Sequence, residues 1–439
     1  MSKKSTKLEE LHHTFKELGI SPETIETNDT LIRKIKKQAD SVPDYRHPSY
    51  VRHLLGDIIM IVFFALLGNA DEWGEIESFA RKKEKWLRKY LELPNGVPTD
   101  DTFRIVIGTI NSEHFFRVTV SILMQVVDGI LQAADRQENI HKKSIVSVDG
   151  KVSCGSGRKT TECGEVKAFQ TLNVYSNDYG MCLCQKFIGE KTNEIPAAQE
   201  VLRMMDLKDM IITADAMNCQ KGTVKVIREG KGDYVLALKR NQGVFYEEVA
   251  GYFDGECQEK LKGKEGCYRK TVEPEHGGVA VREYYITEEI GWYSDKEEWK
   301  GLRSLGYVHK ELRSGNGKTE KEDRYYIRSI GENMEEFERA SRGHWGIENN
   351  LHWQLDFTFK DDKNRSMGKT GGKNLQTMKK NVLSILNIVK ASYRLSMKRI
   401  RYEMSLDYEG EVEKLLSMLD EESIKKALES AENRQKKPV

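Results

Sequence analysis

The sequence predicts an α/β fold, in which a mixed sheet carries a β-rich insertion and follows an all-helical N-terminal domain. A chain of 439 residues exceeds the roughly 250–300 residues over which a single hydrophobic core grows, so we expect two or three units. Residues 47–134 show helical periodicity without a strand signal, whereas short β-branched segments alternate with helical ones from Ser144 onward. This change of pattern predicts a helical domain followed by a sheet.

Composition narrows the class of protein. With 38% hydrophobic and 32% charged residues, the chain has the composition of a globular protein. The formal net charge of +1 does not indicate which kind of partner the protein binds, whereas the local distribution of charge can. The longest apolar run, Ile58 to Leu67, is far shorter than the ~20 residues that span a bilayer. Seven scattered cysteines without a C-x-x-C pair and a charged start without a secretory signal predict a cytoplasmic protein with free thiols and no membrane partner.

The elements of the first part follow from apolar spacing and capping residues. Residues 1–45 are polar and predict an arm with one short helix. Residues 54–67 are apolar all round and predict a buried helix, and residues 72–91 are amphipathic. Thr99 and the two aspartates after it are suited to cap a helix that begins near Thr102. Together with a helix over residues 113–131, these elements predict a helical domain at 46–140.

The sheet is predicted from residue 144 onward. Three strands, a helix, a strand, a helix and a strand follow one another, an order typical of a mixed α/β sheet. In order, these elements are residues 144–149, 168–175, 181–188, a helix over 196–205, 210–215, a helix from about 219, and 234–239. Gly150 and Lys151 are expected to form a turn. Residues 243–330 predict a β-rich insertion, residues 334–356 and 374–395 predict helices, and residues 401–439 predict a charged helix and tail.

Two aspartates at the carboxyl ends of apolar strands are the first chemical signal. Asp149 and Asp215 end their predicted strands, and the carboxyl edge is where open α/β sheets place their sites. Paired carboxylates suit Mg²⁺, which keeps several waters and takes substrate phosphate oxygens as further ligands. The alternative is that each aspartate only caps a turn or helix.

Glu348 is the third candidate carboxylate. Trp345, Glu348, His352 and Leu355 share one predicted helix face, so Glu348 is expected to be at least half-buried. A third carboxylate would allow two ions to act on one phosphodiester. The alternatives are an ion pair between Glu348 and Arg342 or a lysine, or a zinc or iron site of His344, Glu348 and His352. Three ligands at four-residue steps along one helix converge poorly.

Basic residues gather near these carboxylates. Between Lys360 and Ile400, eleven Lys and Arg, Lys360 and Arg365 among them, stand against two Asp, a local net charge of +9. This stretch suits a phosphate backbone, with a solvated helix face as the alternative. Lys239, Asn241 and Gln242 end a strand at the same sheet edge and offer further phosphate or base contacts. The chain has no Walker or Rossmann fingerprint, so we expect no nucleotide cofactor.

Four motifs of the chain occur together in a known family. They are Asp149-Gly-Lys151, Asp215-Ala-Met-Asn-Cys-Gln220, Leu236-Ala-Leu-Lys-Arg-Asn-Gln242 and His344-Trp-Gly-Ile-Glu-Asn-Asn-Leu-His-Trp353. With these motifs the chain resembles the H-repeat-associated (ISAs-type) insertion-sequence transposases of the DDE superfamily. The resemblance covers residues 45–395 in the same order, and residues 53–104 resemble the helical domain that precedes the catalytic part. One departure is Cys154, where relatives often carry an arginine.

The resemblance implies a ribonuclease-H-like catalytic domain at 141–400 whose Asp149, Asp215 and Glu348 are catalytic and bind two Mg²⁺ or Mn²⁺ ions. It implies metal-dependent cleavage and strand transfer at the ends of an element, with terminal repeats and target DNA as partners. A homo-oligomer, nucleoid-associated when bound to DNA, would bring two ends together. The expected DNA contacts are Lys151, Lys239, Asn241, Gln242, Arg342, His344, Trp345, Asn349, Lys360 and Arg365. A non-transposing nuclease and a catalytically silent DNA-binding regulator remain as alternatives.

Overall fold

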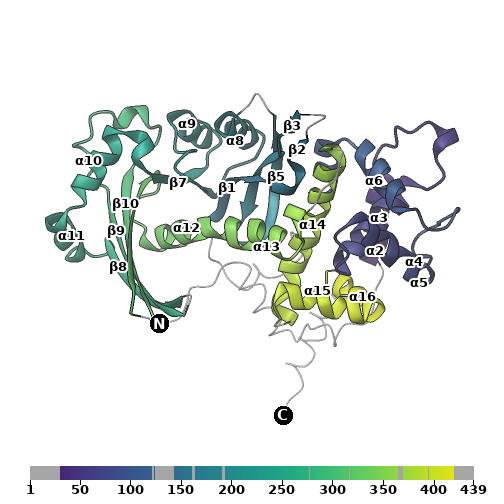
Figure 1. Cartoon of the computed structure of the whole chain (residues 1–439). Helices are drawn as coiled ribbons and strands as arrows, with labels where there is room; N and C mark the ends of the chain where they lie inside the picture. Colours follow the sequence, from purple (N-terminus) through teal and green to yellow (C-terminus); the bar gives the residue numbers. More distant parts are fainter. Residues whose placement is uncertain are drawn as a thin grey trace, which may run out of the picture.

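The computed structural model describes residues 30–120, 123, 143–160, 164–189, 193–275, 277–315, 317–363, 369–393 and 395–419. Within these ranges the chain forms a nine-stranded mixed sheet with helices against it and a helical unit at one end (Figure 1). The predicted α/β class and the helical N-terminal region are thereby confirmed. The cysteines of these ranges are free thiols, and none of the helices described is long and apolar enough to cross a membrane.

The N-terminal helices surround one apolar helix. They are α2 (Thr30–Asp40), α3 (Leu55–Leu67), α4 (Trp73–Lys82), α5 (Glu84–Leu87) and α6 (Asp100–Thr109). Every residue of α3 is buried, including the apolar run Ile58–Leu67, as the sequence predicts for this helix. The buried Asp57 of α3 accepts a hydrogen bond from the Leu93 N–H at 3.0 Å and lies 3.3 Å from the Lys36 ammonium. The Thr99 hydroxyl caps α6, also as predicted.

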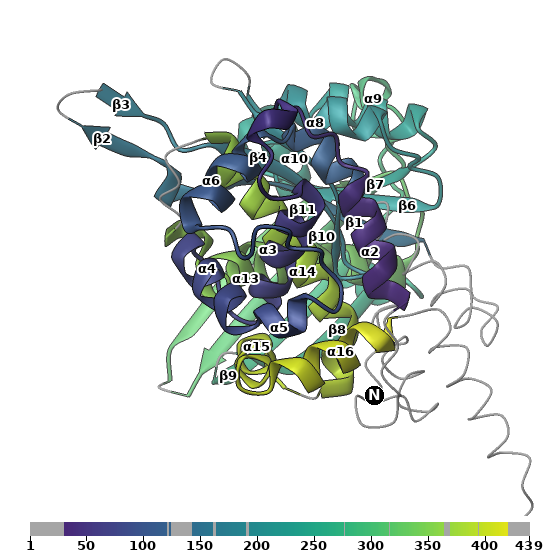
Figure 2. The same ribbon diagram turned by 90° about the vertical axis from the view of Figure 1, so that its right-hand side faces the viewer.

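The first five strands of the large sheet carry the order that the sequence predicts. They are β1 (Ser144–Val152), β4 (Gln170–Ser176), β5 (Met181–Ile188), β6 (Met210–Ala214) and β7 (Asp233–Leu238), with α8 (Glu194–Arg203) and α9 (Lys221–Glu229) between the last three. Antiparallel pairing joins β5 to β4 and β4 to β1, and parallel pairing joins β1 to β6 and β6 to β7. A small hairpin of β2 (Arg158–Thr160) and β3 (Gly164–Val166) projects from the body (Figure 2).

The prediction of a turn at Gly150 and Lys151 is wrong. β1 continues to Val152, because β4 keeps pairing with it as far as Gln170. Its parallel neighbour β6 stops at Ala214, which pairs with Val148. Asp149 therefore does not end its strand but lies where β1 runs past the end of β6.

The insertion widens the same sheet. After α10 (Val244–Tyr252) and α11 (Gly255–Lys262) come the long antiparallel strands β8 (Tyr268–Glu275), β9 (Gly278–Thr287), β10 (Ser304–Ser314) and β11 (Thr319–Arg328). β11 pairs with β7, so the full order is β5-β4-β1-β6-β7-β11-β10-β9-β8. The segment is β-rich as expected, and its strands join the central sheet directly.

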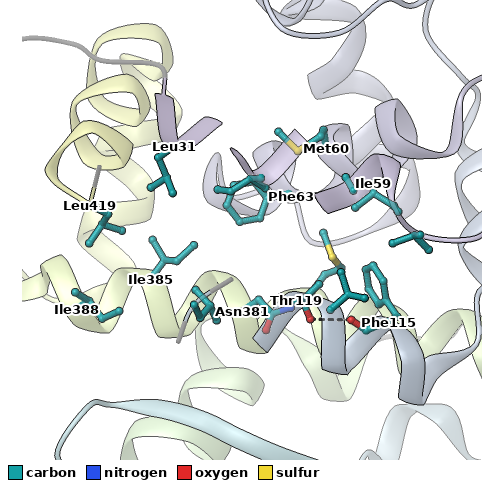
Figure 3. A pocket seen from close by; sticks show the side chains of 16 residues that line it. Leu31, Ile59, Met60, Phe63, Phe115, Thr119, Asn381, Ile385, Ile388 and Leu419 are labelled. Carbon is teal, nitrogen blue, oxygen red and sulfur yellow. Dashed lines mark hydrogen bonds between the residues drawn. The ribbon is translucent and has the colours of Figure 1, made fainter. Parts of the chain in front are cut away.

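The C-terminal helices of the described chain pack against the N-terminal helices. α12 (Met334–Gly346), a π-helical turn (Ile347–His352) and α13 (Trp353–Phe357) cross the sheet and lead to α14 (Lys369–Tyr393), α15 (Met397–Leu406) and α16 (Tyr408–Met418). α3, α14, α15 and α16 bury their apolar side chains in one common core, and Figure 2 shows α15 and α16 beside the N-terminal helices. Between these helices lies a cavity of about 50 Å³ with apolar walls that include Phe63, Ile385 and Leu419 (Figure 3).

Candidate active site

Two aspartates lie side by side at the carboxyl edge of the sheet. Because Val148 and Ala214 are partners in the parallel register, Asp149 of β1 and Asp215, the residue directly after β6, occupy the next position along the two chains. The Asp149 side chain is 18% exposed, and its Oδ1 accepts a hydrogen bond from the Gly150 N–H at 2.9 Å. The structure thus brings together the first two predicted carboxylates.

Asp215 also caps a turn, the alternative role that the sequence allowed for it. Its Oδ1 accepts backbone N–H bonds from Met217 at 3.1 Å and Asn218 at 3.3 Å. These bonds fix the turn after β6, and they hold the carboxylate at the sheet edge. Capping and ligand binding are compatible here, because a carboxylate has several acceptor positions.

Glu348 reaches the same edge because two glycines let α12 lie close to the sheet. A Cβ at Gly343 would lie 2.8 Å from Cγ2 of Ile145 in β1, and a Cβ at Gly346 would overlap the side chain of Asn177. Any larger residue would push the helix away from β1. Glu348 follows in the π-helical turn and is exposed.

The predicted face of this helix is wrong. Trp345 is 41% exposed and Glu348 is exposed, whereas Ile347, Leu351 and Leu355 are buried. The physical reason is the π-helical turn, which adds a residue to the repeat and brings positions four apart onto the buried side. Glu348 is therefore a solvent-facing carboxylate at the sheet edge and not part of an apolar stripe.

Electrostatic coupling places Asp149 among other carboxylates. Burial raises the pKa of Asp149 to about 7 against the opposing Gly150 N–H bond, and the charges of Glu194, Asp215 and Glu348 raise it further. Such a shift means that ionising Asp149 costs free energy when no cation is bound. Asp215, Glu348 and a fourth acid, Glu194, thus lie close enough to act on Asp149.

That fourth acid is Glu194, the first residue of α8, which the sequence analysis missed. Its side chain is buried, its Oε1 accepts a hydrogen bond from Asn218 Nδ2 at 2.8 Å, and its Oε2 accepts one from Gln170 Nε2 at 3.3 Å. Burial raises the pKa of Glu194, the Asn218 bond opposes this, and Asp215 raises it further. No signal in the sequence separates Glu194 from an ordinary acidic residue that opens a helix.

A chain of polar side chains leads from the core to Asp149. The buried Lys380 donates hydrogen bonds to Asn173 Oδ1 at 2.6 Å and to Gln185 Oε1 at 2.8 Å. With its oxygen so engaged, Asn173 presents its Nδ2 to His352 Nε2 at 3.2 Å. His352 then carries its proton on Nδ1, which lies 3.5 Å from Asp149 Oδ2. Burial lowers the pKa of His352 to about 3, so the ring is neutral.

The alternative zinc or iron site is not supported by the geometry. The Nδ1 of His344 is buried without a hydrogen-bond partner among the described residues, and burial lowers the pKa of this ring to about 4. His352 faces Asp149 instead of joining His344 and Glu348. Among the described residues, no three His, Cys, Asp or Glu side chains converge closely enough to grip an ion as they stand.

Asn241 and Gln242 act on the loop that carries Asp215. Asn241 Nδ2 donates to the Ala216 carbonyl and Gln242 Nε2 to the Cys219 carbonyl, both at 2.7 Å. Their amides therefore hold the turn after β6, a role that the sequence analysis did not foresee. Lys239 is exposed at the same edge.

Two other predicted DNA contacts lie in ion pairs. Lys151 is 5% exposed and its ammonium lies 2.5 Å from Asp356. Arg342 donates two hydrogen bonds to Glu273 of β8 at 2.8 and 2.6 Å, and so it braces α12 against the insertion instead of pairing with Glu348.

Three other predicted contacts are at least partly exposed. Trp345 lies under the Arg324 guanidinium, 4.6 Å from the ring centroid. Asn349 is exposed, and Lys360 lies 3.5 Å from Glu75. Arg365 lies outside the described residues.

The basic stretch 360–400 does not form a single solvated face. Lys379 and Lys380 are fully buried. Lys379 lies 3.9 Å from the buried Asp361, and Lys373 lies over the ring of Phe187. Lys379 and Lys380 therefore neutralise or satisfy groups inside the protein, so these two of the eleven cations do not face a partner as expected.

Comparison with known proteins identifies the family. A model described as the transposase DDE domain matches residues 140–371, and a model of the DDE-associated domain matches residues 37–122. The chain is 33% identical to the "Putative transposase YncI" of Escherichia coli O157:H7 over 83% of this chain and 90% of that protein. It is 30% identical to the "H repeat-associated putative transposase YhhI" of Escherichia coli K12 over 75% of this chain and 84% of that protein.

Two further matches are weaker. A protein of Escherichia coli K12 named "Inactive transposase YbfQ" is 32% identical over 18% of this chain and 92% of its own length. Among solved structures, a piggyBac transposase synaptic complex with hairpin DNA matches at a TM-score of 0.34 and 13% identity, over 94% of this chain and 80% of that one. That structural likeness is too low to support any argument. The two family models and the first two relatives show that the chain belongs to the DDE family of insertion-sequence transposases.

Proposed function

We propose that this protein cleaves DNA at the ends of an insertion sequence and transfers the cut strands to target DNA, using Asp149, Asp215 and Glu348. The observation that carries the proposal is the parallel register of β1 and β6, which puts two carboxylates next to each other where the π-helical turn after α12 delivers a third. Phosphoryl transfer needs such acidic groups in a position to hold cations against a phosphodiester.

The strand order supports a ribonuclease-H-like core. Three antiparallel strands followed by two parallel ones, in the order β5-β4-β1-β6-β7, bring an acid on the first strand, one after the fourth and one on a later helix to the same edge. On this view β8 to β11 are an insertion before the last acid that extends the sheet beyond β7.

The donor set fits a hard divalent cation such as Mg²⁺ or Mn²⁺. Asp149, Asp215 and Glu348 offer only oxygen ligands, and none of them forms an ion pair with a lysine or arginine of the described ranges. When bound, one or two such ions would polarise the scissile phosphate and activate the attacking oxygen.

The surrounding residues orient these carboxylates. Asn241 and Gln242 fix the turn that carries Asp215, and the neutral His352 directs its Nδ1 proton toward Asp149. With its Nδ1 3.5 Å from Asp149 Oδ2, the His352 ring limits the directions that this carboxylate can take and leaves its oxygens available for a ligand.

DNA is the partner that this activity requires. Lys239 and Asn349 are exposed at the catalytic edge, and Trp345 with Arg324 adds a cationic aromatic surface nearby. We propose that these residues contact the element end and that a homo-oligomer holds the two ends together.

The test is cleavage of a DNA fragment that carries the element's flanking repeats, with Mg²⁺ or Mn²⁺, by the wild type and by Asp149→Asn, Asp215→Asn and Glu348→Gln. Asp206→Asn, which changes an exposed carboxylate before β6, is the matched control. We expect each site variant to lose cleavage, to retain DNA binding, and to fold as the wild type does.

The outcomes separate the three functions. Joining of the cut end to a second duplex supports a transposase, and cleavage without joining supports a nuclease. DNA binding without cleavage by any form would support a silent regulator, for which a relative named inactive is a precedent in the family. Full activity of Glu348→Gln would show that another acid completes the site.

A further inference from the structure

Glu194 is a buried carboxylate without a cation. Elsewhere the protein pairs its buried acids: Asp71 lies 2.6 Å from Arg401, and Asp178 lies 3.3 Å from Arg339. Glu194 is 7% exposed and forms no ion pair with a lysine or arginine in the ranges that the structure covers. A buried charge without a counterion is costly, so an unpaired acid in a well-packed region needs an explanation.

The neighbours of Glu194 orient it without neutralising it. Asn218 Nδ2 donates to Glu194 Oε1 at 2.8 Å and also lies 3.4 Å from Asp215 Oδ1, so a single amide bridges two acids. Gln170 supports Oε2. Neutral amides fix the direction of both carboxylates but leave their charges in place.

The backbone of β1 makes room for this carboxylate. A Cβ at Gly150 would overlap Oε2 of Glu194, and Gly150 directly follows Asp149. The absence of a side chain at this position therefore lets Glu194 approach the strand beside the catalytic aspartate. Gly150 has no positive φ, so close approach is what requires a glycine here.

Beside Glu194 lies a buried oxygen that lacks a hydrogen bond. Asn218 is fully buried, and its Oδ1 has no hydrogen-bond donor in the part of the chain that the structure describes. An unsatisfied buried acceptor costs about 1–3 kcal/mol. Next to two carboxylates without cations, it indicates that a cation or the water bound to one completes the group.

We propose that Glu194 is a fourth carboxylate of the metal site, binding an ion directly or through its coordinated water, in addition to Asp149, Asp215 and Glu348. The inference rests on the proposed function for the presence of the metal. It adds that α8 contributes a ligand, which ties the metal to the face of the sheet opposite α12, as Figure 1 shows.

The test measures metal affinity without DNA, by calorimetric titration of the protein with Mn²⁺. Glu194→Gln removes the charge at nearly constant volume, and Glu200→Gln, an exposed residue of the same helix that pairs with Lys186, is the control. We expect about a tenfold or greater loss of Mn²⁺ affinity in Glu194→Gln and wild-type affinity in Glu200→Gln. Gly150→Ala removes no carboxylate, but its methyl group would occupy the space of the Glu194 carboxylate, so this variant should also bind Mn²⁺ more weakly.

A second measurement needs no variant. With Fe²⁺ in place of Mn²⁺ and a peroxide, hydroxyl radicals cut the backbone near the bound ion, and we expect cuts at the start of α8 as well as beside Asp149 and Asp215. Wild-type affinity in Glu194→Gln together with lost affinity in Asp215→Asn would overturn the proposal, as would the absence of cuts at α8.

These results are independent of DNA cleavage. Metal binding that depends on Glu194 in a protein that cuts no DNA would refute the proposed function and leave the Glu194 site standing. Absence of Mn²⁺ binding by the wild type would refute the metal site altogether, Glu194 included.

Discussion

Replacing Asp149 with asparagine should stabilise the metal-free protein, and more so at alkaline pH. Burial and the neighbouring carboxylates raise the pKa of Asp149 from 3.8 to about 7. Because the folded-state pKa lies above the unfolded one, ionised Asp149 destabilises the fold. The free energy of unfolding then falls as pH rises through the window from about 3.8 to about 7. Asparagine has the same shape, can still accept the Gly150 N–H bond, and does not titrate.

The magnitude follows from the shift. Each tenfold change in acidity corresponds to about 1.4 kcal/mol, so the full shift costs about 4 kcal/mol at pH 8. At pH 5, where folded Asp149 is still largely protonated, the cost is about 2 kcal/mol. We therefore expect Asp149→Asn to gain about 2 kcal/mol more relative to wild type at pH 8 than at pH 5.

The assay is thermal unfolding followed by fluorescence, in chelator, at pH 5 and pH 8. Asp206→Asn, on the surface, should track the wild type at both pH values. Addition of Mg²⁺ at pH 8 should raise the unfolding temperature of the wild type and reduce its gap to Asp149→Asn, because a bound cation relieves the repulsion. A gap between variant and wild type that is the same at both pH values would refute this account of the site.

Three further predictions concern polar side chains that hold other groups in place. Arg401→Met should lower the free energy of unfolding by about 3–5 kcal/mol, because Asp71 stays buried without its partner. Urea unfolding measures this loss of stability, and a loss under about 1 kcal/mol would contradict the prediction. Lys380→Met should cost about 1–3 kcal/mol for each of the two amide oxygens that lose their donor; stability equal to wild type in the same assay would show that those oxygens find other donors. Asn241→Ala should lower the free energy of unfolding by only about 1 kcal/mol. It should also weaken Mn²⁺ binding, because the turn that carries Asp215 loses the hydrogen bond from Asn241. Unchanged Mn²⁺ affinity in a calorimetric titration would show that Asn241 does not position Asp215.

Local patterns were sufficient to predict the order of the central elements and the first two acids. β-branched runs and helical spacing are properties of contiguous residues, so β1, β4, β5, α8, β6, α9 and β7 appear in the predicted order. Asp149 and Asp215 could be paired because parallel strands align their carboxyl ends. The end of β1 could not be placed, since its last residues pair with β4 and not with β6.

The burial of Glu194 and of two lysines could not be predicted from local sequence patterns. An acid at the first position of α8 looks like any residue that favours a helix start, and its burial depends on the absence of a side chain at Gly150, far away in sequence. Lys379 and Lys380 look like a solvated basic run, yet α14 packs between the sheet and the N-terminal helices and buries both. In each case the environment is created by contacts between elements distant in the chain.

The common core of the first and last helices has a consequence for how the protein is made. α3 is buried on every side, and α15 and α16 supply some of its contacts. The Arg401 guanidinium donates to the Leu66 carbonyl, and the Tyr408 hydroxyl donates to the Phe64 carbonyl. A ribosome that has just released α3 still has more than half of the chain to translate before those partners emerge. The nascent segment must stay shielded throughout that time, a task that suits a chaperone. A copy of the gene truncated ahead of α15 would therefore yield an aggregation-prone product cleared by proteases, and not a shorter working enzyme.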